Sequence, residues 1–167
     1  CMVSKASKKG KTEKGIVKKY EELRKKHSLP KYEEMVNEFE IDSISEEDNI
    51  TRELIKKIYD KFDSYANLME SLMQPDSRIS YMKESSSLSK LERKSVEELY
   101  SGLILFTREL LELNLDYDEK KAVEKIKELY SNWILLKPEI RKIVQKIKTS
   151  WKEKITQDFS SYIGNFI

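Results

Sequence analysis

The sequence feature that most constrains the fold is a series of apolar residues spaced alternately three and four positions apart. From Ile55 to Leu72, and again from Val96 to Leu113, the spacing is 3, 4, 3, 4 and 3. This heptad pattern places the apolar side chains on one stripe of an α-helix. Each series is short and is followed by a chain breaker, which favours packing within the chain over an intermolecular coiled coil. The two stripes are Ile55, Ile58, Phe62, Tyr65, Met69 and Leu72, and Val96, Leu99, Leu103, Phe106, Leu110 and Leu113.

Two further helices are predicted in the C-terminal part of the chain. One apolar stripe runs from Val123 to Trp133 and another from Ile140 to Ile155, with Pro138 between them. Proline suits the first position of a helix, because its missing amide hydrogen would be unpaired there anyway. We therefore expect a new helix to begin at Pro138. The apolar residues are Val123, Ile126, Tyr130 and Trp133, then Ile140, Ile143, Val144, Ile147, Trp151 and Ile155.

The connections between these helices are marked by breakers and capping residues. Residues 75–89 include Pro75 and a serine run and predict a surface loop. Ser89 and Glu92 then form the capping-box pattern that opens a helix. The same spacing joins Ser45 to Asp48 and Asp116 to Glu119.

The N-terminal third predicts two shorter helices separated by Pro30. Ile16, Val17, Tyr20 and Leu23, and after the break Tyr32, Met35, Val36 and Phe39, recur at helical spacing. The fold class is therefore all-α. Four long amphipathic helices are most economically buried against one another, so we expect an antiparallel bundle with the two short N-terminal helices packed outside it.

The domain organisation follows from composition. Residues 1–12 are rich in lysine and poor in apolar groups, which predicts a disordered basic arm. Residues 13–163 form a single helical domain and residues 164–167 a C-terminal tail. From Met2 to His27 there are ten basic residues and three glutamates, whereas Ser28 to Ile50 holds one lysine and eight acids, so blocks of +7 and −7 follow each other. Such blocks either neutralise each other or face different partners.

Several classes of chemistry lack the residues they need. His27 is the only histidine and Cys1 the only cysteine, so neither a zinc site nor a disulfide can be built from them. No glycine-rich phosphate loop is present, and no acid occupies a stripe position where a di-iron site would need one. We expect no enzyme activity, no metal and no cofactor. The longest apolar runs have four residues, far short of a membrane span, so we expect no membrane contact and a cytoplasmic location.

Two kinds of interaction site remain as candidates. Basic residues that would contact nucleic acid or the ribosome lie in the arm and on the Pro138 helix, where three of them share one stripe. Aromatic and apolar residues near the C-terminus either fold back or dock a partner. The basic set is Lys5, Lys8, Lys9, Lys11, Lys14, Lys18, Lys19, Arg141, Lys148 and Lys152, and the docking set is Phe159, Tyr162, Ile163 and Phe166.

The stretch Leu29-Pro30-Lys31-Tyr32-Glu33-Glu34 through Asn37-Glu38-Phe39-Glu40-Ile41, followed by long charged helices, resembles small uncharacterised helical proteins of archaea. The resemblance implies an intracellular archaeal protein and assigns no role to any residue.

The sequence thus favours a non-enzymatic helical module for protein–protein interaction or scaffolding, whose partner and oligomeric state it does not identify. The alternative is a protein associated with nucleic acid or the ribosome through the basic arm and the basic stripe.

Overall fold

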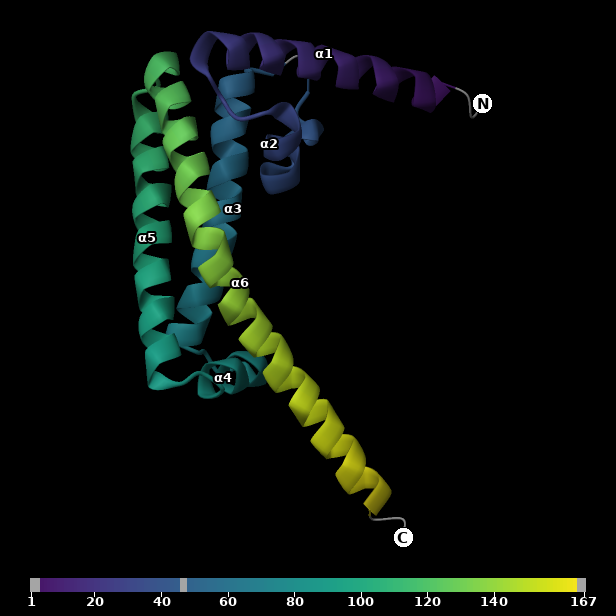
Figure 1. Ribbon diagram of the computed structural model, residues 1–167, viewed down its shortest axis with the longest axis vertical. Coiled ribbons are helices and arrows are strands. Elements are labelled where there is room, and N and C mark those ends of the chain that lie inside the picture. Colours follow the sequence, from purple (N-terminus) through teal and green to yellow (C-terminus); the bar gives the residue numbers. More distant parts are fainter. Residues whose placement is uncertain (1–3, 46–47, 165–167) are drawn as a thin grey trace. The chain divides into compact units, whose positions relative to one another are not determined.

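The fold is all-helical in the part of the chain that the structure, a computed structural model, describes (Figure 1). The backbone is described for residues 4–45 and 48–164, and side chains for residues 15–45 and 48–156. No strand occurs in these residues. The elements are α1 (Ser4–His27), α2 (Tyr32–Phe39), the 3-10 helix η1 (Ile41–Ser43), α3 (Ile50–Met73), α4 (Ile79–Ser86), α5 (Lys90–Leu115) and α6 (Glu119–Gly164).

The described residues divide into two compact units. Unit 1 takes the residues up to Asp63 together with Leu105–Trp133, and unit 2 takes Ser64–Ile104 together with the residues from Ile134 onwards. Helices α3, α5 and α6 therefore each contribute a segment to both units. The division into an arm, a single domain and a tail stays a prediction.

The core of unit 1 is centred on Phe62 of α3. Its ring centroid lies 5.7 Å from that of Phe106 on α5 and 5.8 Å from that of Trp133 on α6. Aromatic pairs at such separations contribute beyond their buried area. Phe62 is fully buried and Trp133 almost so. One cluster of rings therefore joins three helices, and buried aliphatic residues extend it: Leu54, Ile58, Leu110, Val123, Ile126 and Leu129.

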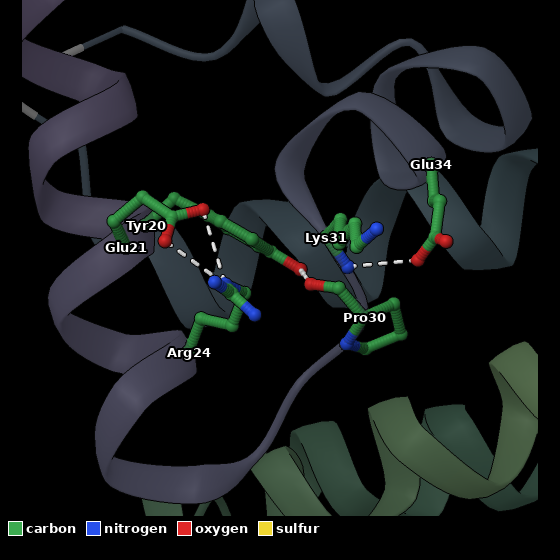
Figure 2. A network of polar contacts seen from close by, with 6 residues as sticks. All are labelled: Tyr20, Glu21, Arg24, Pro30, Lys31 and Glu34. Atoms are coloured by element: carbon green, nitrogen blue, oxygen red, sulfur yellow. Dashed lines mark hydrogen bonds and ion pairs between the residues drawn. The ribbon is translucent and has the colours of Figure 1, made fainter.

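Helices α1 and α2 are joined through Tyr20, a fully buried residue of unit 1 (Figure 2). Its hydroxyl donates a 2.8 Å hydrogen bond to the carbonyl oxygen of Pro30, and its ring lies 5.5 Å from that of Tyr32. The predicted break is present, because α1 ends at His27 and Ser28 has a φ of 55°. This left-handed conformation is a common way to end a helix.

The core of unit 2 is made by the expected stripes of α3, α5 and α6. Met69, Leu103 and Ile140 have at most 3% of their surface exposed. At these positions the stripes predict burial correctly.

Two elements differ from the sequence-based expectation. The predicted loop at residues 75–89 contains α4, an eight-residue helix from Ile79 to Ser86. Pro138 does not begin a helix but lies inside α6, which has 46 residues. The φ of proline is compatible with both positions, and the residues before Pro138 continue the helix despite the missing amide hydrogen bond. The predicted fourth long helix is therefore the second half of α6.

The helix starts also differ in detail. The side chain of Asn49 accepts from the Arg52 amide at 3.1 Å and caps α3, and that of Asp118 accepts from the Lys121 amide at 2.8 Å and caps α6. The cap predicted at Asp116 is thus two positions early. The Ser45 amide does donate to the Asp48 carboxylate at 3.2 Å, but α3 begins only at Ile50. Helix α1 has 24 residues and begins at Ser4, so it overlaps the arm predicted for residues 1–12. Of the two N-terminal helices that were predicted to be short, only α2 is short.

Candidate functional site

An open hollow lies within unit 2, where the end of α3 meets the start of α5. Its volume is about 760 Å³. The floor is apolar, since Leu72, Leu88 and Val96 have at most 6% of their surface exposed. Leu91 stands at the rim with 76% exposed. We call this hollow the α3–α5 groove, and its lining residues are Leu72, Met73, Gln74, Leu88, Lys90, Leu91, Arg93, Lys94, Val96 and Glu97.

The walls of the groove are fixed by one buried serine of α4. The Ser85 hydroxyl donates a 2.7 Å hydrogen bond to the Leu72 carbonyl oxygen at the end of α3. The guanidinium of Arg93, on α5, donates to the Ser85 hydroxyl at 3.1 Å and also to the Ser85 carbonyl oxygen. Charged donors make the stronger hydrogen bonds. Ser85 therefore links the end of α3 to the first turns of α5.

The start of α5 is held by the capping box that the sequence predicts. The Ser89 amide donates to the Glu92 carboxylate at 2.7 Å, and the Glu92 amide donates to the Ser89 hydroxyl at 3.2 Å. Hydrogen bonding of the Glu92 carboxylate with the backbone amide and the side chain of Ser89, with a smaller contribution from the Lys146 ammonium, holds the pKa of Glu92 below its usual value. The predicted box is confirmed, and it fixes the end of α5 that borders the groove.

The rim of the α3–α5 groove is cationic. Lys90, Arg93 and Lys94 are exposed there, with Glu97 as the single carboxylate among the lining residues. Lys94 also lies 3.7 Å from Glu98 in an exposed ion pair, which is a weak interaction in water. The groove therefore combines an apolar floor with a positive edge.

The predicted basic stripe on α6 is present in unit 2. Arg141, Lys148 and Lys152 are exposed on one helix, and none of them forms an ion pair with a described residue. Val144 and Ile155, predicted on the apolar face, are instead 40% and 65% exposed. The period of the helix places these two beside the stripe, at the edge of the buried face, so the apolar stripe is narrower than predicted.

The remaining predicted site residues are only partly described. Lys18 and Lys19 are exposed on α1 in unit 1. The side chains of the arm residues and of the C-terminal docking residues lie outside the described residues. These are Lys5, Lys8, Lys9, Lys11 and Lys14, and Phe159, Tyr162, Ile163 and Phe166.

Trp151 connects α6 to α4 in unit 2. Its indole nitrogen donates a 2.8 Å hydrogen bond to the Glu84 carboxylate, and the Lys83 ammonium lies 4.8 Å from its ring centroid. A cation over an indole face is a favourable contact. Trp151 is thus a packing residue, half-buried.

No group of three or more histidine, cysteine, aspartate or glutamate side chains that would hold a metal ion is found among the described residues. Within the same part of the chain, none of the helices has the length and apolar character that a membrane crossing requires.

The groove was not predicted from the sequence. Leu88 and Leu91 lie outside the heptad stripe that begins at Val96, so they were not assigned a partner. A usable signal was present, because Leu88 and Leu91 lie close to the Ser89 capping position, and apolar residues at a helix start often contact other apolar groups.

In comparisons with protein-family models, curated proteins and solved structures, nothing matches this chain.

Proposed function

We propose that this chain is a non-enzymatic helical protein–protein interaction module that binds a helix of a partner protein in the α3–α5 groove. The observation that carries the proposal is an open apolar groove of about 760 Å³ with Leu91 exposed at its rim. Exposed apolar surface rimmed by polar residues is characteristic of interaction sites. Amphipathic helices bind such grooves through apolar side chains spaced three, four and seven positions apart.

The chemistry of the lining argues against a small polar ligand. The volume falls in the range of small-molecule pockets, but those pockets place several convergent polar groups around the ligand. Here the floor consists of Leu72, Leu88 and Val96, and the charged groups stand at the rim. A partner that supplies a row of apolar side chains matches this surface better.

The distribution of exposed apolar residues supports the same reading. Among the residues whose side chains are described, ten large apolar ones are well exposed, and seven of them belong to unit 2 and three to unit 1. More of the described exposed apolar residues therefore lie in unit 2, the unit that holds the α3–α5 groove. The seven are Ile79, Met82, Leu91, Ile134, Leu135, Val144 and Ile155.

The proposal is tested with a panel of synthetic amphipathic helical peptides that share the same leucine anchors and differ only in the charge of the polar face. Binding to the full chain is measured by fluorescence anisotropy, and Leu91→Glu is the disrupting variant. Because Leu91 is exposed, this change should leave the helix content and the unfolding midpoint close to the parent. At least one peptide should bind the parent and bind the variant about tenfold or more weakly, since a buried leucine contributes roughly 2 kcal/mol. If no peptide binds, the proposed function is wrong.

We further propose that segments of α3, α5 and α6 pack antiparallel within each unit. Helices α5 and α6 are joined by residues 116–118 only, and so short a connection favours antiparallel neighbours. Spin labels at Arg108 and Glu124 of unit 1 should then couple strongly. Weak coupling would contradict the antiparallel arrangement.

A second candidate function is favoured by the basic stripe of α6. Arg141, Lys148 and Lys152 are exposed and without an ion pair to a described residue, so their charge is available to phosphates. Each phosphate contact steepens the salt dependence of DNA binding by roughly 0.9 in log–log slope. The measurement is duplex DNA affinity across a salt series, for the parent and for the variant with all three residues changed to Gln. The slope should fall by roughly 2.7. Lys142→Gln, which removes a positive charge that is paired with Glu139, is the control.

Both candidates are proposed for the cytoplasm. A chain with a single cysteine needs no disulfide and is suited to a reducing compartment.

A further inference from the structure

We propose that the partner helix bound in the α3–α5 groove is acidic, with aspartate or glutamate residues on the flank that faces the first turn of α5. This inference rests on the proposed function and adds the charge class of the partner. It is drawn from three features of the groove: the cations at its rim, the exposed start of α5, and the apolar anchor between them.

The cations are placed along one side of the groove. Lys90 and Lys94 are exposed and lie four positions apart on α5, so they project from the same face of the helix. The guanidinium of Arg93 is held in place by its hydrogen bonds to Ser85. Against these three cations the lining holds one carboxylate, that of Glu97. An acidic flank on the partner would be attracted, and a basic flank would be repelled.

The start of α5 adds a second source of positive potential. The Ser89 hydroxyl satisfies the amide of Glu92, while the amides of Lys90 and Leu91 have no acceptor among the described residues. Unpaired amides and the helix dipole give the first turn a partial positive charge. This turn borders the groove, so a partner carboxylate beside Lys90 would meet both the ammonium group and the helix end.

Apolar anchoring accounts for the rest of the interaction. Leu91 is 76% exposed and lines the groove together with Lys90 and the buried floor residue Leu88. Covering it with a partner side chain removes exposed apolar surface from water, which is favourable. The groove thus fits a helix with an apolar stripe for the floor and an acidic flank for the α5 edge.

The test uses three peptides with identical leucine stripes and with glutamate, glutamine or lysine on the flanking positions. Dissociation constants for the full chain are measured by anisotropy at low salt and at about 0.5 M salt, where surface charges are largely screened. The glutamate peptide should bind about three- to tenfold more tightly than the glutamine peptide at low salt, and the lysine peptide more weakly than both. The difference between glutamate and glutamine should largely vanish at the higher salt.

Variants assign the effect to the groove. Lys90→Gln combined with Lys94→Gln should weaken binding of the glutamate peptide by the same three- to tenfold and leave the glutamine peptide unchanged. Lys142→Gln, which removes one positive charge elsewhere in unit 2, is the control and should change neither. Leu91→Ala should weaken both peptides together.

The possible failures can be told apart. Equal binding of the three peptides, abolished by Leu91→Glu, would overturn the acidic partner and leave the interaction module in place. No binding of any peptide would overturn both. If sedimentation shows a dimer that Leu91→Glu converts to monomer, the occupant of the groove is a second copy of this chain and the inference is wrong.

Discussion

The indole nitrogen of Trp133 donates a 2.7 Å hydrogen bond to the carboxylate of Glu38, a residue 95 positions earlier in the chain. Phe39, next to Glu38, packs its ring 6.1 Å from that of Trp133 and 6.5 Å from that of Tyr130. All three contacts lie within unit 1 and join α2 to α6. A charged acceptor for a buried N–H group makes this one of the stronger polar contacts of the unit.

Replacing Glu38 by Ala should lower the free energy of unfolding by about 1 to 3 kcal/mol, because the buried indole N–H group loses its acceptor. Urea unfolding followed by tryptophan fluorescence measures the change. Glu38→Gln keeps an oxygen acceptor and should lie close to the parent. If Ala and Gln behave alike, the hydrogen bond does not stabilise the fold.

Tyr20→Phe should destabilise unit 1 by about 1 kcal/mol, because the Pro30 carbonyl oxygen loses its donor.

The parent should also lose stability in alkaline solution. Burial raises the pKa of Tyr20 above its usual value of 10.0, so the unfolded chain ionises first. The stability due to this shift is fully present below pH 10 and is lost as the pH rises through the folded-state pKa. Unfolding titrations at pH 8 and about pH 11 should show a smaller loss for Tyr20→Phe, and an equal loss would contradict the assignment to Tyr20.

Ser89→Ala should cost about 1 kcal/mol, since it removes the hydroxyl that caps α5. Glu92 makes this cap pH-dependent. Its pKa is lowered in the folded state, so its contribution is present above the unfolded value of 4.5 and is lost as the pH falls through the folded-state pKa. The thermal unfolding midpoints of the parent and of Glu92→Gln should therefore differ at neutral pH and converge as the pH falls. A constant gap would show that Glu92 acts by other means.

Pro138→Ala distinguishes the observed helix from the predicted one. Inside α6 a proline removes one hydrogen bond and crowds the preceding turn, so Ala should raise stability by about 1 to 3 kcal/mol. At a helix start the same change would matter little. Chemical denaturation gives the sign, and an unchanged midpoint would favour a helix boundary at Pro138.

The sequence predicts those parts of the fold that depend on local periodicity. Ile58, Leu103 and Ile126 are buried because their spacing leaves them no other face of the helix. The Ser89–Glu92 box is likewise local, since both partners lie within one turn. Helical content and stripe positions could therefore be read before the structure.

Other features depend on contacts between distant residues and could not be predicted. Helix α4 has eight residues and no repeating stripe, and Ser85 ties it to Leu72 and Arg93 on other helices. The α3–α5 groove depends on these contacts between helices, so no local sequence pattern predicts it. Pro138 was predicted wrongly for a different reason. The φ of proline is compatible with both a helix start and a helix interior, so the local sequence does not distinguish the two.

Two residues on either side of α2 have a left-handed φ of 55°: Ser28, which follows the end of α1, and Glu40, which follows the end of α2. Between them the chain must place Met35 and Phe39 in the core. Adding or deleting one residue would turn both side chains by about 100° around the helix axis, away from their partners. We therefore expect the segment 28–40 to tolerate substitutions at its exposed positions but not insertions or deletions.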